Sequence, residues 1–521
     1  MSGRGLLVSD RAGPLLIGLD LGTSALKCAA YTEDGSLVAS STKEYGLLTP
    51  TANVVEVHPF TYWNEFSSAI HDLLAEPGVD TAQIAAIGIS AQGETLIPVH
   101  ANGTPTRNAI VWLDGRATEE SDELADRFDE KQFYEVTGQP SMLPTWPAAK
   151  ILWLARREAN LFDQTARFLL IEDYFLWRLT GEYVSEGSLL TSTCYWDFRT
   201  KLWWPEMLEA LGIDQSRLPA IVEPGVAVGK LLPDVALELG LPASTTVCTG
   251  ALDQACGAIG VGTVGPGRFS ENTGAAVALC ATLREARLDP ERRMPCHYHG
   301  VPDTYMFHTF TSGGVVLRWY RDQFGDAERS VASSSGRDAY DLLVEEAGTI
   351  APGSEGLVLI PHLQGAMAPE SNANARDAVV GLNLRHGRAH VARAILESIA
   401  FVVRRNVEVL EDLGLEIPEI RALGGGARSR LWKQIEADVT KRPVLTTRQP
   451  DAATLGAAIL AGVGLGRYVS AQEAAEEMVQ IDETFEPRAG NCGFYDETYA
   501  IYKQTYEALC PVFDSLAKVQ A

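Results

Sequence analysis

The sequence lacks the features of several large classes of protein. No stretch reaches the roughly 18 consecutive apolar residues that a membrane-spanning helix needs, and residues 1–16 carry neither the apolar core nor the cleavage site of a secretory signal. The eight cysteines include no C-x-x-C pair, and cysteines scattered in this way are typical of reduced thiols. We therefore expect a cytoplasmic protein that neither crosses a membrane nor depends on disulfides.

Positive charge is also scarce. The chain has 43 Lys and Arg against 68 Asp and Glu, a formal net charge of −25. This balance argues against binding to nucleic acid or to an anionic membrane surface. An anionic ligand is still compatible with it, provided that backbone amides, a few cations or a metal ion hold that ligand locally.

The composition present is that of a globular protein, with 46% apolar and 21% charged residues. At 521 residues the chain is too long for one simple core. Strand and helix patterns alternate, and each half has a strand, a small-residue turn with an acid or hydroxyl, and another strand. We predict two α/β domains, residues 14–250 and 251–521, with a helical insertion in residues 146–204.

Residues 17–27, IGLDLGTSALK, place an acid in an apolar strand. A buried carboxylate is costly unless it is compensated, so Asp20 either caps a local turn or faces a cation. Mg²⁺, held through water because it dehydrates reluctantly, is one such cation. Thr23 and Ser24 in a glycine turn can present hydroxyls and amides to phosphate oxygens, and Lys27 can reach a terminal phosphate. An ordinary hairpin capped by Asp20 is the alternative.

Residues 249–262, TGALDQACGAIGVG, place Asp253 in a second apolar, small-residue run. An aspartate at the mouth of a cleft suits a general base for a hydroxyl group. A helix N-cap explains the same residue for about 1 kcal/mol. The spacing alone does not separate the two interpretations.

Three further stretches have simple patterns. Residues 270–279, SENTGAAVAL, predict two strands around Thr273 and Gly274, either a second phosphate hairpin or a plain turn. Residues 420–439 predict a strand, three glycines against which a purine can lie, and an amphipathic helix. Residues 451–462 predict a tightly packed helix of small residues.

In this order along the chain, these stretches resemble the FGGY family of carbohydrate kinases, from about Leu15 to Gly466. Residues 381–401 resemble the C-terminal signature helix of the family. Residues 146–158, WPAAKILWLARRE, resemble its first signature, although Thr145 and Arg157 fit that pattern poorly, and Asp377 stands where a small residue is usual. The resemblance implies a two-domain actin-like, ribonuclease-H-like ATPase fold with a catalytic cleft between the domains.

The resemblance also implies ATP and Mg²⁺ as cofactors and a small-molecule sugar or polyol as substrate. It assigns Asp253 as the catalytic base and places Asp20 on the side of the Mg²⁺ ion. We also expect a homodimer. The residues that the resemblance assigns to the nucleotide are Asp20, Gly22, Thr23, Ser24, Lys27, Thr273, Gly274, Gly314, Gly425, Gly426 and Arg430.

The substrate loop is expected in residues 90–117. A polyhydroxylated substrate needs both donors and acceptors, because each unpaired buried hydroxyl is costly. The expected substrate residues are Gln92, Gly93, Glu94, Trp112, Asp253 and Gln254. The simpler interpretations are a solvated loop for Gln92 and Glu94, and core packing for Trp112.

The sequence combines features of two branches of the family, the glycerol kinases and the xylulose kinases. Glycerol kinases carry an arginine where this chain has Gly93, so a wider pocket is expected here. This favours a ketopentose such as D-xylulose or a related polyol, with glycerol, erythritol and gluconate kinases as alternatives.

Two other classes of protein share part of this pattern. An actin-like filament or an Hsp70-like chaperone ATPase shares the phosphate loops but should lack the Gln-Gly-Glu substrate loop. A dehydrogenase is disfavoured, because the triple glycine lacks the G-x-G-x-x-G spacing. The histidine pairs His386/His390 and His297/His299 are interpreted as structural.

Overall fold

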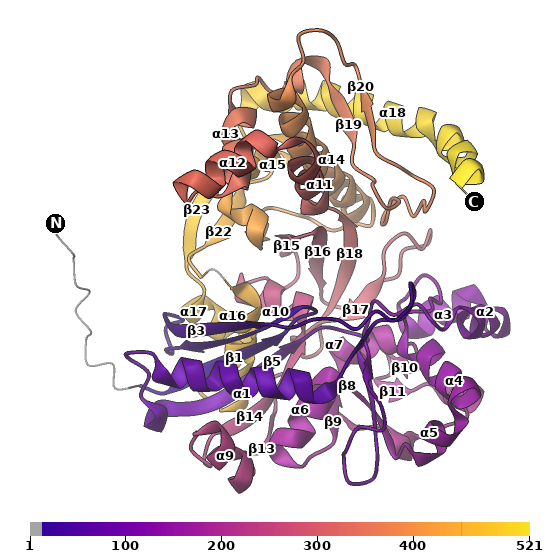
Figure 1. Ribbon diagram of the computed structural model, residues 1–521, viewed down its shortest axis with the longest axis vertical. Coiled ribbons are helices and arrows are strands. Elements are labelled where there is room, and N and C mark those ends of the chain that lie inside the picture. The colour runs from indigo at the N-terminus through magenta and orange to yellow at the C-terminus, as the bar shows by residue number, and fades with distance from the viewer. Residues whose placement is uncertain (1–12, 450, 521) are drawn as a thin grey trace.

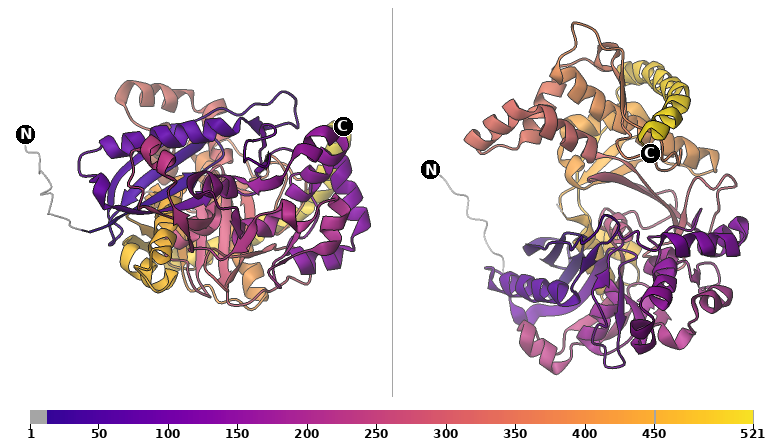
Figure 2. Two further views of the ribbon diagram at one scale, coloured as in Figure 1. Left: turned by 90° about the horizontal axis from the view of Figure 1, so that it is seen from below. Right: turned by 45° about the vertical axis from the view of Figure 1, so that its right-hand side comes forward.

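The computed structural model describes residues 13–449 and 451–520. These residues form two bodies that lie one above the other along the long axis (Figure 1), and a rotated view shows the same division (Figure 2). The expectation about a secretory signal concerns residues 1–16, of which 1–12 lie outside the described residues. None of the described helices combines the length and apolar character that crossing a membrane requires.

The lower body is built on a sheet that has six strands within the described residues, in the order β13-β14-β5-β1-β2-β3. Its three central strands are parallel and almost wholly buried, which explains their continuous apolar runs. The strands are β1 (Leu15–Leu21), β2 (Ala25–Tyr31), β3 (Leu37–Glu44), β5 (Ile84–Ala91), β13 (Ala227–Lys230) and β14 (Thr246–Leu252).

Three helices near this sheet come from distant parts of the chain. Helix α1 (Pro59–Ala75) packs on β2 and β3, and α16 (Ala452–Gly464) packs on β1, β5 and β14. Helix α10 (Asp253–Gly260) packs on α16 so closely that a Cβ at Gly456 would lie 1.9 Å from the carbonyl oxygen of Cys256. The small residues of α16 are therefore needed for packing, as the sequence predicted.

An insertion between β3 and β13 adds a small sheet, in the order β4-β7-β6-β8, and a group of helices. The helical insertion predicted for residues 146–204 is confirmed, with short strands added to it. The strands are β4 (Glu56–Val57), β6 (Leu96–Val99), β7 (Ala109–Ile110), β8 (Arg167–Leu170), β9 (Val184–Glu186), β10 (Trp196–Asp197), β11 (Leu202–Trp203) and β12 (Ala220–Val222). The helices are α2 (Thr118–Arg127), α3 (Glu130–Thr137), α4 (Pro147–Arg157), α5 (Ala159–Gln164), α6 (Ile171–Thr180), α7 (Gly187–Leu190) and α8 (Pro205–Leu211). Helix α9 (Pro233–Leu239) lies outside the insertion, between β13 and β14.

The upper body contains a second sheet, in the order β17-β18-β16-β15-β21-β22-β23, with helices packed around it. The strands are β15 (Phe269–Thr273), β16 (Ala276–Leu283), β17 (Cys296–Tyr298), β18 (Tyr305–Ser312), β19 (Val358–Ile360), β20 (Ala378–Val380), β21 (Ile420–Leu423), β22 (Val444–Thr447) and β23 (Ile481–Phe485), of which β19 and β20 pair apart from the main sheet. The helices are α11 (Gly314–Phe324), α12 (Asp326–Ser335), α13 (Ala339–Gly348), α14 (Arg388–Asp412), α15 (Arg430–Thr440) and α18 (Ala489–Gln520).

The predicted mixed α/β organisation is confirmed. The chain is not simply divided in the middle, however, because α16 and α17 (Ala471–Met478) lie in the lower body (Figure 1), although in sequence they stand between β22 and β23 of the second sheet. The boundary at residue 250 stays a prediction. The eight cysteines are all free thiols.

Candidate active site

The three parallel strands of the first sheet end side by side. Leu21 at the end of β1 pairs with Ala91 of β5, and Ala91 pairs in turn with Leu252 of β14. The chain segments that begin with Gly22, Gln92 and Asp253 therefore leave the sheet at one edge. In open α/β sheets, ligands bind outside this carboxyl edge.

Asp20 lies near this edge and is held by a neighbouring strand. The Ser90 hydroxyl donates a 2.8 Å hydrogen bond to Asp20 Oδ1. The pKa of Asp20 is raised to about 6. Burial is the main cause and the Asp451 carboxylate adds to it, while Lys27 and Ser90 act to lower the pKa. A carboxyl group with this environment favours a nearby cation.

Lys27 already has a partner that the sequence analysis did not find. Its Nζ lies 2.7 Å from Asp451 Oδ2, just before α16. Burial acts to lower the pKa of Lys27, but Asp451 more than offsets this and raises it above the usual value. The expected contact of Lys27 with a terminal phosphate stays a prediction.

The turn after β1 is joined to the substrate loop. Gly22 donates its N–H to the Ala25 carbonyl at 3.1 Å, which closes the turn, and Ser24 at its tip is exposed. The Trp112 indole N–H donates a 2.8 Å hydrogen bond to the Thr23 hydroxyl. Trp112 is therefore more than a packed core residue, because its polar edge contacts the predicted phosphate loop.

Asp253 is the first residue of α10, and the N-cap position belongs to Leu252. The interpretation of Asp253 as the N-cap is therefore wrong. Its Oδ1 accepts the Gln254 N–H at 2.7 Å. Burial raises the pKa of Asp253 to about 8, and the nearby carboxylates of Asp20 and Glu94 add to this effect. The three acids are thus brought together.

Two buried side chains fix the strand end that carries Asp253. The Gly250 N–H donates to Glu172 Oε1 at 2.7 Å, and the Leu252 N–H donates to the Ser188 hydroxyl oxygen at 2.9 Å. Ser188 in turn donates to Glu186 Oε1 at 2.6 Å. The sequence analysis missed these residues, because nothing in their spacing relates them to β14.

The substrate loop is buried rather than solvated at Gln92. Gln92 is 2% exposed, and its Nε2 donates to the Gly22 carbonyl at 3.2 Å. Its Oε1 is buried without a hydrogen-bond partner among the described residues. A hydroxyl group of a ligand can supply the missing donor.

The next two residues of this loop are also constrained. A Cβ at Gly93 would lie 3.0 Å from Leu252 Cδ1 and 3.5 Å from Ser192 Oγ, so these side chains already take part of the space that Gly93 was expected to leave open. Glu94 has a φ of +54°, in the left-handed region. Burial raises the pKa of Glu94, whereas Ser192 and Lys150 act to lower it.

On the second sheet, the strands β15 and β21 end together. They are parallel, with Asn272 opposite Leu423, so the Thr273–Gly274 turn lies beside the triple glycine. A Cβ at Gly426 would lie 2.5 Å from the Thr273 side chain, which explains why a glycine is needed there. Gly314 at the start of α11 donates its N–H to the Gly274 carbonyl at 3.0 Å. The hairpin predicted around Thr273 is confirmed.

A cavity of about 220 Å³ lies next to the triple glycine. Gly424, with a φ of +79°, lines it, as does the predicted residue Arg430, whose guanidinium pairs with Glu483. The other lining residues are Ala422, Leu423, Ala427, Arg428, Thr446, Thr447, Arg448, Gln449, Ala452, Asp482 and Phe485. Gly425 lies in the short 3₁₀ helix Gly425–Arg428 behind this wall.

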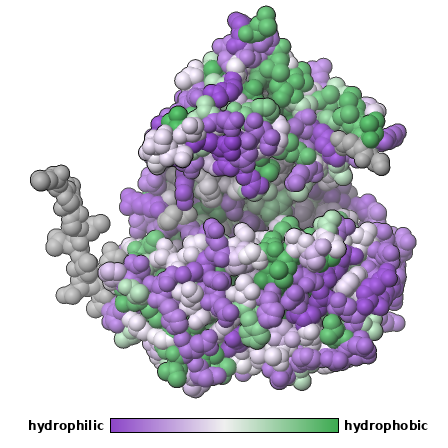
Figure 3. Space-filling model, in the orientation of Figure 1, coloured by the Kyte–Doolittle hydropathy of each residue, from purple (hydrophilic) through white to green (hydrophobic). Residues whose placement is uncertain are grey.

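One hydrogen bond connects the two halves of the site. Asn272 Nδ2, beside the Thr273 turn, donates to Gln254 Oε1 at 3.2 Å, beside Asp253. The surface is hollowed between the two bodies (Figure 3). The predicted phosphate turns and the predicted base therefore lie around one region between the bodies.

Family models match both halves of the chain: the N-terminal domain of the FGGY family of carbohydrate kinases matches residues 15–260, and the C-terminal domain matches residues 277–465. The chain belongs to the FGGY family of carbohydrate kinases. It is an ATP-dependent sugar kinase, so a filament or chaperone ATPase is no longer an alternative.

Similar proteins include xylulose kinases and a gluconate kinase. The chain is 30% identical to a xylulose kinase of Bacillus subtilis (strain 168), over 94% of this chain and 96% of that one. The structure of a ligand-bound xylulose kinase from Lactobacillus acidophilus matches with a TM-score of 0.87 and 28% identity, covering 96% of this chain and all of that one. A gluconate kinase from the same organism also matches with a TM-score of 0.87, at 27% identity over 96% and 99%. These neighbours confirm the expected two-domain actin-like ATPase fold.

Proposed function

We propose that this kinase phosphorylates a primary hydroxyl of a neutral ketopentose such as D-xylulose. One observation carries the proposal: three carboxylates, those of Asp20, Glu94 and Asp253, are clustered at the acceptor side, and the first two raise the pKa of the third. An acceptor with its own carboxylate, such as gluconate, would add a further acid to this cluster. The unpaired Oε1 of Gln92 supports an acceptor that offers hydroxyl donors.

In this proposal Asp253 acts as the general base. The hydroxyl oxygen of the sugar attacks the γ-phosphorus, the bond from that phosphorus to the β–γ bridging oxygen breaks, and ADP leaves. The hydroxyl proton passes to the Asp253 carboxylate. A pKa raised to about 8 makes the ionised Asp253 carboxylate a stronger base than the carboxylate of a free aspartate.

The residues around Asp20 fit a Mg²⁺ ion held through water. The carboxylates of Asp20 and Asp451 lie close enough to repel each other, and Lys27 compensates only part of their negative charge. No cluster of three or more His, Cys, Asp or Glu side chains suited to a metal occurs among residues 13–449 and 451–520. Mg²⁺ keeps several waters and is bound largely by substrate phosphates. There it would neutralise charge on the phosphate oxygens.

The nucleotide would lie along the second sheet. The hydroxyl groups of Thr23 and Ser24, in the turn after β1, and of Thr273, in the turn after β15, would contact phosphates. The cavity at Gly424 and Arg430 would take the adenosine.

A screen of acceptors tests the proposal. ADP production with Mg-ATP is measured for D-xylulose, other pentuloses, pentitols, glycerol, erythritol and gluconate, with Asp253→Asn as the matched inactive control. We expect the highest kcat/KM for a ketopentose. A clear preference for gluconate or glycerol would overturn the proposed acceptor.

A further inference from the structure

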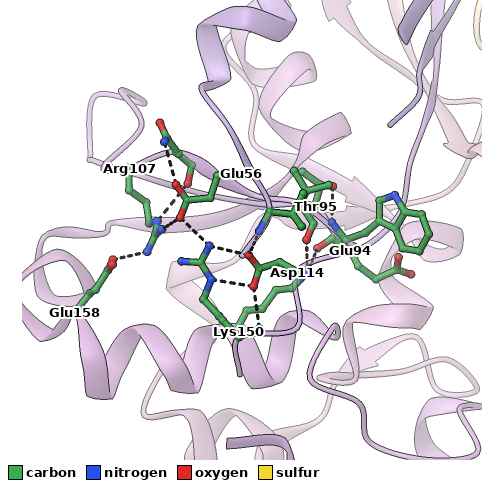
Figure 4. A network of polar contacts seen from close by, with 12 residues as sticks. Glu56, Glu94, Thr95, Arg107, Asp114, Lys150 and Glu158 are labelled. Atoms are coloured by element: carbon green, nitrogen blue, oxygen red, sulfur yellow. Dashed lines mark hydrogen bonds and ion pairs between the residues drawn. The ribbon is translucent and has the colours of Figure 1, made fainter. Parts of the chain in front are cut away.

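Lys150 is a buried cation that the proposed reaction does not use. It belongs to α4, in the stretch that resembles the first family signature, and its side chain is 0% exposed. Its Nζ donates to two backbone carbonyl oxygens, that of Glu94 at 3.1 Å and that of Val111 at 3.0 Å (Figure 4). Among the described residues, no carboxylate forms an ion pair with Lys150.

The two carbonyls belong to the two branches of the substrate loop. One is that of Glu94, whose left-handed backbone is uncommon for a residue other than glycine and needs support from its surroundings. The other precedes Trp112, whose N–H donates to the Thr95 hydroxyl oxygen at 3.2 Å and whose indole reaches Thr23. Lys150 therefore joins the residue before Thr95 to the residue before Trp112.

The charged groups around Lys150 are already satisfied by others. Asp114 is fully buried, and its Oδ2 accepts the Val55 N–H at 2.6 Å and lies 2.7 Å from Arg116. Arg116 also lies 2.7 Å from Glu56 (Figure 4). Asp114 thus has its counter-ion in Arg116, and the ammonium of Lys150 is left for the carbonyls.

A lysine in this position costs more than an apolar side chain would. Burial lowers the pKa of Lys150 to about 7, although Glu94 and Asp114 act to raise it and Arg116 to lower it. Simple filling of this space by methionine or leucine would avoid that cost. The two carbonyl contacts are the feature that an apolar residue cannot reproduce.

We propose that Lys150 is a positioning residue, which fixes the spacing between the two branches of the substrate loop and thereby places Glu94 and Trp112 against the acceptor. The inference rests on the proposed function, because it takes these two residues as acceptor contacts. Among the described residues, neither hydrogen bond of Lys150 goes to a residue assigned to the nucleotide. Loss of Lys150 should therefore separate the two substrates kinetically.

The test compares Lys150→Met, which removes the donors, with Lys150→Arg, which keeps them, and uses Lys433→Met as a buried-lysine control in the other body. Steady-state kinetics use the acceptor that the parent phosphorylates best, so failure of the ketopentose assignment leaves this test in force. We expect Lys150→Met to raise the KM of the acceptor at least about tenfold and to leave the KM of ATP within about twofold, because only acceptor contacts are misplaced. Lys150→Arg should recover part of the loss, and Lys433→Met should leave the acceptor KM unchanged below its melting temperature.

Amide hydrogen exchange gives a second readout. In Lys150→Met, amides in residues 92–96 and 111–114 should exchange faster, while those in residues 270–276 should not change. If Lys150→Met does not fold, Lys150→Gln is measured in the same two ways. An unchanged acceptor KM with unchanged exchange overturns the proposal, as does an equal rise in the KM of both substrates.

Discussion

Two fully buried lysines support the two halves of the site, and the protein holds them in different ways. Lys433 on α15 contacts carboxylates, with its Nζ 2.7 Å from Glu271 Oε2 on the strand that leads to Thr273, and it also pairs with Glu436. Lys150 contacts backbone carbonyls. Burial acts to lower both pKa values, but Glu271 and Glu436 raise that of Lys433 above its usual value, whereas that of Lys150 falls to about 7.

The difference shows two ways to support a binding loop. Side-chain charges hold the nucleotide half, so its support depends on keeping each partner of a buried ion pair. Backbone carbonyls hold the acceptor half, and a carbonyl is present whatever side chain the loop carries. Residues 92–94 can therefore vary with the acceptor without loss of the support beneath them.

The largest effect is expected from removing the proposed base, which lies in the acceptor half. Asp253→Asn should lower kcat by at least about 100-fold, since a positioned general base contributes about 10²–10⁴. The KM of ATP, measured in the same ADP-release assay, should stay near the parent value. Near-full activity would leave Asp253 with no role beyond the start of α10.

The next largest effect tests the difference between the two lysines directly, through the stability that each one contributes. Lys433→Met leaves Glu271 and Glu436 buried without a counter-ion and should lower the free energy of unfolding by about 3–5 kcal/mol. Lys150→Met leaves only carbonyls unpaired and should lose less, about 1–3 kcal/mol. Urea denaturation measures both. Equal losses would show that the two supports do not differ in kind.

A smaller effect concerns the metal side of the acceptor half. Asp20→Ala should raise the Mg²⁺ concentration needed for half-maximal activity by about tenfold, the size expected for one lost water-mediated anchor. Mg²⁺ titrations at fixed ATP provide the measurement, with Ser90→Ala as a control that keeps the carboxylate. Overlaying titrations of Asp20→Ala and the parent would remove Asp20 from the metal site.

The site also shows which features could be predicted from the sequence alone. Local patterns were enough for β1, β14, the hairpin at Thr273 and the tight helix α16, because apolar runs, glycine turns and small residues act over a few neighbouring positions. That Asp20 and Asp253 belong to one site followed from the family resemblance and not from these patterns.

The pairing of Lys27 with Asp451 could not be predicted in the same way. It depends on α16 returning to the first sheet from the far end of the chain. The same applies at Gly93, where Ser192 and Leu252 take part of the space. Such contacts are set by how distant elements pack, and residue spacing carries no information on that.

A still smaller effect tests the link between the substrate loop and the predicted phosphate loop. Trp112→Phe removes the 2.8 Å hydrogen bond to Thr23 and should weaken acceptor binding by about 0.5–1.5 kcal/mol. Thr23→Val should cost a similar amount. Because the two residues share one hydrogen bond, the double variant should lose less than the sum of the single losses. Strict additivity of the acceptor KM changes would show that the bond does not matter.

The smallest expected effect concerns the buried cluster of carboxylates around Asp253. It is followed by melting temperature and does not depend on an activity assay. The pKa of Asp253 is raised from its usual value of 3.8 to about 8 in the fold. The native state therefore holds this proton more tightly than the unfolded chain, so the stability contributed by the group is full below pH 4 and is lost as the pH rises to about 8. Asp253→Asn removes that loss, and its melting temperature should exceed that of the parent by about 1–3 °C at pH 9. The difference should shrink steadily towards pH 5. A difference that is constant with pH would show that burial and the neighbouring Asp20 and Glu94 do not raise the pKa of Asp253, and the acceptor half would then lack the crowding of acids on which the proposed preference for a neutral acceptor depends.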